Sequence, residues 1–128
     1  MSTRTIPTEL TPTQLETLKQ KLLVARSELV SRREGQLRAR TGLLSEVEDE
    51  ADAASRANDE DRLVLLAEVE HDRLLEIDHA LSKFDTGEYG IDEDTGEPIG
   101  FPRLSVIPWA RYAAQTQEEH DRRRGVLP

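Results

Sequence analysis

The stretch Glu46-Val47-Glu48-Asp49-Glu50-Ala51-Asp52-Ala53-Ala54 separates two long helical patterns and decides the fold. On each side of it, apolar residues recur at alternating steps of three and four. These positions are Leu15, Leu18, Leu22, Ala25 and Leu29 before it, and Leu63, Leu66, Val69, Leu74, Ile77, Leu81 and Phe84 after it. Two narrow apolar stripes of this period, joined by a short polar link, predict an antiparallel coiled-coil hairpin.

The link itself is crowded with acidic side chains. Residues 45–61 contain eight acids and a single base, Arg56. Acids that are so close together repel one another and contribute little to the stability of a helix end. We therefore expect the end of the hairpin, near residues 46–54, to contact something outside the chain.

Composition divides the chain into a thin helical part and a small compact part. Of the 128 residues, 36% are apolar and 34% are charged, which is typical of long exposed helices. All the aromatic residues fall between Phe84 and Tyr112. We predict a mainly α-helical protein with a flexible tail (1–11), a coiled-coil hairpin (12–84) and a globular domain (85–128).

Charge and cysteine content exclude several classes of protein. The net charge of −9 argues against direct DNA binding, which needs a basic face to displace counterions from phosphates. The chain has no cysteine, so it can form neither a disulfide nor a thiolate metal site. No apolar run approaches the length of a membrane span, and we expect a cytoplasmic protein.

The helix boundaries have specific chemical signals. Thr11 can cap the first helix, Pro12 suits its first position, and Gln14 can reach back to the cap. This helix is predicted to run to about residue 45, and the second from between residues 50 and 55 to about Phe84. Gly87 can then take the left-handed conformation that ends a helix.

The globular domain is predicted to contain a short β-hairpin and a C-terminal helix. Two apolar segments, 87–91 and 98–101, flank a turn rich in Asp and Gly at 92–97. Pro108 opens a last helix of about residues 108–124.

Several residues have structural interpretations that compete with a functional one. Asp49 and Asp52 lie where acids cap a helix N-terminus. The arginines of the first helix, from Arg26 to Arg40, can pair with acids on the second helix or with an outside acidic surface.

The three histidines are interpreted as solvated surface residues. The turn 92–97 fits a calcium loop poorly, because Arg103 stands where a bidentate Glu is needed. No nucleophile is paired with a histidine, so we do not expect an enzyme.

The finger-like segment carries a resemblance to a known family. The residues Gly87-Glu88-Tyr89-Gly90-Ile91, Gly96-Glu97-Pro98-Ile99, Arg103-Leu104 and Pro108 resemble the zinc-finger segment of the DksA/TraR family of bacterial transcription factors. On that frame the family's four zinc-binding cysteines are replaced by Asp92, Thr95, Ala113 and Thr116. The family's D-x-x-D-x-A tip motif falls on Asp49, Asp52 and Ala54. The chain thus resembles a cysteine-free member.

The resemblance implies a partner and a mode of action. The family's hairpin enters the secondary channel of RNA polymerase, where the tip aspartates reach toward the active centre and modulate initiation. A stiff pair of helices supplies the necessary reach, and the tip carboxylates can pair with basic residues or perturb metal ions there. We expect no cofactor and, because the hairpin closes its own seam, a monomer.

Two departures from the family have consequences. Without zinc, Asp92 can accept hydrogen bonds from the amides near Asp94 and Thr95, and an apolar nucleus can replace the thiolates. The residues expected in this nucleus are Ile99, Phe101, Trp109, Tyr112 and Ala113. Family members that respond to ppGpp use basic residues at positions that here hold Glu76, Ile107 and Gln117, so we predict poor ppGpp binding.

Two other functions remain open. The chain could be a coiled-coil adaptor that docks on another protein or pairs with itself, in which case the seam matters and the tip does not. It could also act as a Gre-type cleavage factor, although the finger-like frame argues against this.

Overall fold

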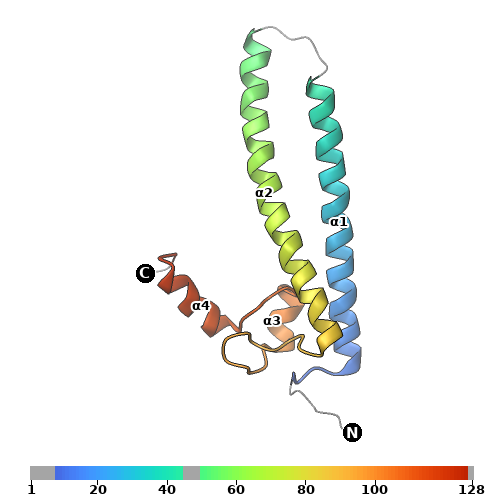
Figure 1. Ribbon diagram of the computed structural model, residues 1–128, viewed down its shortest axis with the longest axis vertical. Helices are drawn as coiled ribbons and strands as arrows, with labels where there is room; N and C mark the ends of the chain where they lie inside the picture. The colour runs from blue at the N-terminus through green and yellow to red at the C-terminus, as the bar shows by residue number, and fades with distance from the viewer. Residues whose placement is uncertain (1–7, 45–49, 127–128) are drawn as a thin grey trace. The chain divides into compact units, whose positions relative to one another are not determined.

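A computed structural model describes residues 8–44 and 50–126. In this part of the chain the order of elements is α1 (Pro12–Leu44), α2 (Glu50–Thr86), α3 (Phe101–Val106) and α4 (Ala114–Arg123). α1 and α2 form an antiparallel hairpin (Figure 1), as the two apolar stripes predicted. None of the described helices is long and apolar enough to cross a membrane.

The chain divides into two compact units. We call the described residues of the ranges 1–24 and 76–128 the globular unit, and Ala25–Leu75 the shaft. α1 and α2 contribute turns to both units.

The local chemistry at the helix ends agrees with the sequence. The N–H of Gln14 donates to the Thr11 hydroxyl at 3.1 Å, and the Gln14 side chain accepts the N–H of Thr11 at 3.1 Å. This reciprocal pair is the predicted capping box. At the C-terminal end of α2, Gly87 has a φ of 75° and the N–H of Glu88 donates to the carbonyl of Lys83 at 3.0 Å. Gly87 therefore ends α2 as predicted.

The seam of the shaft differs from the prediction in one respect. Leu29 and Glu70 are buried, whereas Leu66 and Val69 are 48% and 61% exposed. Glu70 accepts a hydrogen bond from Gln36 at 3.0 Å and pairs with Arg32 at 3.3 Å. The prediction that Leu66 and Val69 lie in the seam is wrong, because the paired carboxylate of Glu70 occupies the inward position. Arg32 follows the predicted pairing between the basic first helix and acids of the second.

The core of the globular unit is formed by residues from all its elements except α4. Leu18 and Leu22 of α1, Ile77 of α2 and Leu104 of α3 are fully buried. Tyr89 joins them, stacks on Phe84 with ring centroids 4.1 Å apart and donates its hydroxyl to the carbonyl of Pro108 at 2.8 Å.

The predicted apolar nucleus is only partly correct. Ile99 is buried, but Phe101, Trp109, Tyr112 and Ala113 are half-buried. Tyr89, Leu104 and the side chains of α1 and α2 take the place that these four residues were expected to fill, because the ends of the hairpin supply most of the apolar surface available for burial.

The predicted β-hairpin does not form in the described residues. Ile91 and Pro98 make one isolated antiparallel bridge, flanked by hydrogen bonds from Asp92 N to Glu97 O (2.8 Å) and from Ile99 N to Gly90 O (2.8 Å). Pro98 has no N–H to extend a ladder, and Gly90 and Gly100 have positive φ values that end the extended conformation on both sides. The segment between Gly90 and Gly100 therefore consists of turns, and we call it the knuckle.

The predicted helix 108–124 is also wrong in its start. Phe101, expected at the end of a strand, begins the short helix α3, in which Pro102 occupies one of the first positions. Residues 107–113 then form turns, because the carbonyl of Tyr112 and the N–H of Ala113 bond to side chains elsewhere in the unit. The last helix, α4, begins at Ala114.

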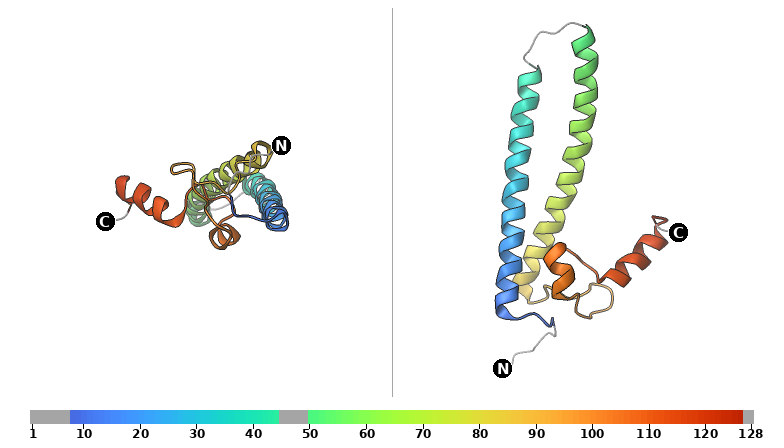
Figure 2. Two further views of the ribbon diagram at one scale, coloured as in Figure 1. Left: turned by 90° about the horizontal axis from the view of Figure 1, so that it is seen from below. Right: turned by 180° about the vertical axis from the view of Figure 1, so that it is seen from behind.

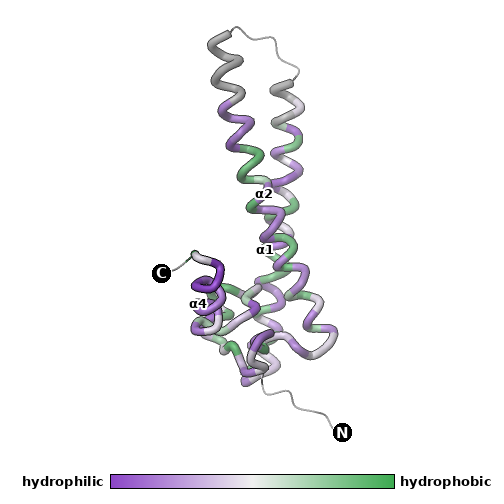
Figure 3. Tube along the Cα trace, turned by 60° about the vertical axis from the view of Figure 1, so that its left-hand side comes forward, coloured by the Kyte–Doolittle hydropathy of each residue, from purple (hydrophilic) through white to green (hydrophobic). Residues whose placement is uncertain are grey.

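Within the globular unit, α3 lies beside the adjoining turns of α1 and α2, and α4 extends away from them (Figure 2). α4 is hydrophilic along its length (Figure 3), and Thr116 is its buried residue. Before the start of α1, Leu10 packs over Gly90, where a β-carbon would come within 2.9 Å of the leucine methyl. The segment that leads into α1 thus contacts the knuckle.

Candidate functional site

Asp92 is the centre of the knuckle. It is 1% exposed, and its Oδ1 accepts the N–H groups of Asp94 (2.8 Å) and Thr95 (2.9 Å), as the sequence predicted. Its Oδ2 accepts the N–H of Ala113 at 2.8 Å. Burial raises the pKa of Asp92, but the donors from Thr95, Ala113 and Asp94 and the hydroxyl of Thr116 outweigh it and hold the pKa below its usual range.

The positions that the resemblance assigns to the family's zinc ligands are therefore gathered around one carboxylate. Thr95 and Ala113 bind Asp92 through their backbone, and Thr116 binds it through its side chain. The carboxylate connects the turn after α2 to the start of α4, which is the task of a metal ion in a zinc finger. Among the residues that the structure describes, no group of three or more His, Asp or Glu side chains is placed to hold a metal ion.

The next residue, Glu93, ties the same turn to α2. Its carboxylate pairs with Lys83 at 2.8 Å, with the ring of His79, and with Arg111 at 3.2 Å. Burial raises the pKa of Glu93, but the hydrogen bonds and positive charges of Lys83 and His79 prevail and lower it to about 2. Glu93 is thus an anion held by Lys83, Arg111 and the ring of His79.

Arg111 links Glu93 to Glu76. Its Nε and Nη2 donate to the two carboxylate oxygens of Glu76 at 2.7 and 3.1 Å, and its backbone carbonyl accepts the N–H of Glu93 at 2.9 Å. The hydrogen bond to Glu76 raises the pKa of Arg111 further above its usual range. The fork geometry fixes both partners in one plane.

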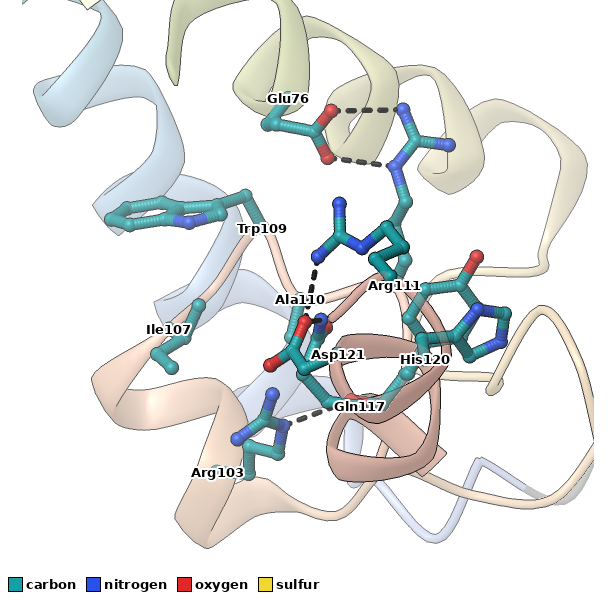
Figure 4. Close-up of a pocket in the computed structure, with 11 residues that line it drawn as sticks. Glu76, Arg103, Ile107, Trp109, Ala110, Arg111, Gln117, His120 and Asp121 are labelled. Atoms are coloured by element: carbon teal, nitrogen blue, oxygen red, sulfur yellow. Dashed lines mark hydrogen bonds and ion pairs between the residues drawn. The ribbon is translucent and has the colours of Figure 1, made fainter. Parts of the chain in front are cut away.

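A cleft of about 580 Å³ opens beside this network (Figure 4). Its wall combines apolar and charged side chains: Glu76, Arg103, Ile107, Trp109, Ala110, Arg111, Tyr112, Gln117, His120, Asp121 and Arg124. The three positions that the resemblance associates with ppGpp all line this cleft. There, Glu76 faces the guanidinium of Arg111, and Gln117 donates to Asp121 at 3.0 Å.

Two histidines that were interpreted as solvated surface residues are partly exposed, and each also binds an acid of the site. His79 bonds Glu93 and lies 3.1 Å from Arg111 Nη1. His120 stacks on Tyr112 with centroids 4.3 Å apart and bonds Asp94 at 3.1 Å. His71 is exposed as predicted and contacts Arg33. His79 is 14 positions from Glu93, and His120 is 26 positions from Asp94. The sequence therefore gives no local signal for these pairs beyond the two adjacent acids.

The predicted tip residues are only partly within the described part of the chain. Asp49 lies outside the described residues. Asp52 and Ala54 belong to the first turns of α2, whose start at Glu50 agrees with the sequence prediction, and their side chains lie outside the described part.

The chain is similar to bacterial proteins over most of its length. It is 42% identical over 116 residues to the RNA polymerase-binding transcription factor DksA of Caulobacter vibrioides, an alignment that covers 88% of this chain and 80% of the relative. An uncharacterised protein of Aquifex aeolicus is 41% identical over 115 residues, covering 88% of this chain and 79% of that protein. No profile of a known protein family matches the chain.

A solved structure has the same fold. Transcription factor DksA2 from Pseudomonas aeruginosa aligns with a TM-score of 0.78 at 35% identity, covering 88% of this chain and 87% of that one. The alignment is too long to rest on the hairpin alone, so the knuckle and the helices that follow it take part in the similarity.

Proposed function

Because the chain belongs to the DksA family of RNA polymerase-binding transcription factors, we propose that it regulates initiation by inserting the acidic end of its hairpin into the polymerase secondary channel. The observation that supports this most directly is the 42% identity spread over 80% of the Caulobacter DksA. The family is one of transcription factors, in agreement with our expectation that the chain is not an enzyme. Its place of action is then the cytoplasm, with RNA polymerase.

Asp49, Asp52 and Ala54 are the residues to which we assign contact with the polymerase active centre. They form the D-x-x-D-x-A motif, and α2 begins beside the first of them. Two carboxylates at the end of a helical pair can bind basic side chains near a catalytic centre or disturb its metal ions. The protein performs no covalent chemistry in this mechanism.

In this proposal the globular unit holds together the turns of α1 and α2 that it contains, and it does so without zinc. In this proposal Asp92 takes the place of the metal, because it accepts hydrogen bonds from Thr95, Ala113 and Thr116, where the resemblance puts the other thiolates. Such a unit should keep its structure where zinc is scarce, since no metal has to be bound for the turn and α4 to be joined.

The response to ppGpp should be weak. A polyanionic nucleotide needs cations that are free to bind phosphate, and this cleft presents Glu76 and Gln117 at two of the relevant positions. Arg111 is held by Glu76 and Glu93.

A promoter-complex lifetime assay with purified RNA polymerase tests the tip assignment. The Asp49→Asn/Asp52→Asn variant should lose most of the effect on lifetime while it still competes with the wild type for the polymerase. Asp59→Asn/Glu60→Gln removes two charges from the same acidic region and should retain the effect. If both double variants behave like the wild type, the tip assignment is wrong and the adaptor interpretation gains support.

A further inference from the structure

The shaft carries large apolar side chains on the face of α2 that points away from α1. Leu65 and Val69 are 63% and 61% exposed. Leu63, Ala67 and Leu74 line the space between α1 and α2, so they mark the inward face. At about 100° per residue, Leu65 and Val69 lie on the other side of the helix. A hydrophobic stretch of α2 is visible in Figure 3.

Two charged residues extend this face into a stripe. Arg62, Leu65, Val69 and Asp72 follow one another at steps of three, four and three, which is the spacing of a coiled-coil seam. The Arg62 side chain is 81% exposed and lies 4.0 Å from Asp59. Asp72 is exposed as well. We call these four residues the outer stripe.

The outer stripe is complementary to itself in one orientation. A two-fold axis through Ala67 that sets two copies of α2 antiparallel places Leu65 of one copy against Val69 of the other. The same axis places Arg62 against Asp72, and it does so twice because the interface is isologous. A parallel arrangement would instead set arginine against arginine and aspartate against aspartate, which is unfavourable.

We propose that this surface binds a second copy of the chain in a weak antiparallel dimer, with apolar contacts between Leu65 and Val69 and ion pairs between Arg62 and Asp72. Covering Leu65 and Val69 supplies the driving force, and the ion pairs select the orientation. The apolar part is small compared with a standard interface, so the dimer dissociates readily on dilution. The monomer expected from the closed seam is then the dilute form.

The dimer would bear on the proposed function in one way, and this point rests on that function. A shaft that enters a narrow channel cannot have a second copy on its outer stripe, so polymerase and self-association compete. The experiment below contains no polymerase, so its failure leaves the proposed function untouched.

Analytical ultracentrifugation of the full chain over a wide concentration range tests the proposal. The wild type should show reversible monomer–dimer exchange. Arg62→Asp and Asp72→Arg should each raise the dissociation constant of the dimer by about tenfold, because each change turns two symmetric attractive pairs into repulsive ones. An equimolar mixture of the two variants should regain nearly the wild-type affinity, since every charged pair between unlike copies is again of opposite sign.

The recovery on mixing is the decisive readout. Arg62 and Asp72 are ten positions apart on one helix, about 15 Å, so a loss of folding in either variant could not be repaired by adding the other. Leu65→Ser should also weaken association, whereas Val106→Ser, at a site in α3 that is 75% exposed, should not. A wild type that stays monomeric up to about 1 mM, or single variants that associate no better together than apart, would overturn the proposal.

Discussion

The carboxylate of Asp92 accepts the backbone N–H of Ala113 at 2.8 Å, across 21 positions of the chain. This bond joins the turn that follows α2 to the residue before α4. Because Oδ1 of the same carboxylate accepts two further N–H groups, one side chain holds three backbone N–H groups in place. The knuckle therefore depends on a buried charge where a zinc finger would depend on a metal.

Replacing Asp92 should unfold this region first. Asp92→Asn keeps the volume but substitutes an amide nitrogen for an acceptor oxygen, which leaves at least one buried N–H without a partner. Bonds to a charged acceptor contribute about 1.5–3 kcal/mol each, and we expect a loss of about 3 kcal/mol in unfolding free energy. Urea denaturation measures this loss. Asp94→Asn, at a side chain that is 46% exposed, is the matched control and should cost less than 1 kcal/mol, about the value of a surface pair.

The geometry around Asp92 predicts that cysteines at the four positions would rebuild a metal site. We expect the Asp92→Cys/Thr95→Cys/Ala113→Cys/Thr116→Cys variant to bind one zinc ion and to melt at a lower temperature when a chelator is added. The wild type should melt at the same temperature with and without the chelator. A variant that takes up no zinc would show that the four positions do not surround a common point.

The acid stability of the globular unit should depend on Glu93. Its pKa lies at about 2 in the folded protein, below its ordinary value of 4.5. Because the folded pKa is depressed, the stabilisation is present in full above pH 4.5 and is lost as the pH falls toward 2. Glu93→Gln should lower stability at neutral pH and flatten the dependence between pH 4.5 and 2, as denaturant titrations at several pH values would reveal. Equal slopes for wild type and variant would contradict this role.

The buried Glu70 of the shaft should be replaceable by an apolar residue. Its partner Arg32 has a side chain that is 60% exposed, so removal of the carboxylate strands no buried cation. Replacement of a buried ion pair by a hydrophobic residue is often neutral or stabilising. We expect Glu70→Leu to raise the stability of the hairpin by about 1 kcal/mol in thermal melts followed by circular dichroism. A clear decrease would mean that the Arg32 and Gln36 contacts outweigh desolvation.

The cleft beside Arg111 should bind ppGpp poorly. In promoter-complex lifetime assays, addition of ppGpp should change the effect of this protein by less than about twofold, because Glu76 and Gln117 supply no phosphate-binding cation. The same assay with the polymerase alone gives the background effect of ppGpp. Tight equilibrium binding of ppGpp to the reconstituted complex would contradict the prediction.

Local signals were read correctly where the chemistry lies within a few residues. The capping pair of Thr11 and Gln14, the start of α2 near Glu50 and the left-handed Gly87 were all predicted from neighbours in the sequence. The acceptor role of Asp92 toward Asp94 and Thr95 was predicted for the same reason. Such interactions need no knowledge of how distant segments pack.

The errors arose where a periodic pattern was compatible with more than one arrangement. Leu66 and Val69 matched the apolar stripe, but a hydrophobic period cannot reveal that Glu70 finds Arg32 and Gln36 across the seam. The expected helix from Pro108 does not form there, because the Arg103 side chain binds the carbonyl of Tyr112, a backbone group that a helix would need. In both cases a tertiary partner outweighed the local preference.

By itself, the sequence determined the antiparallel hairpin, the acidic link between its helices and the absence of thiolate ligands, because these follow from period, charge and composition. Only the tertiary structure decided that His79, Glu93, Arg111 and Glu76 form one network and that Asp92 reaches Ala113. Those contacts join residues 14 to 35 positions apart, and their free energy is gained only after the chain has closed the intervening loops.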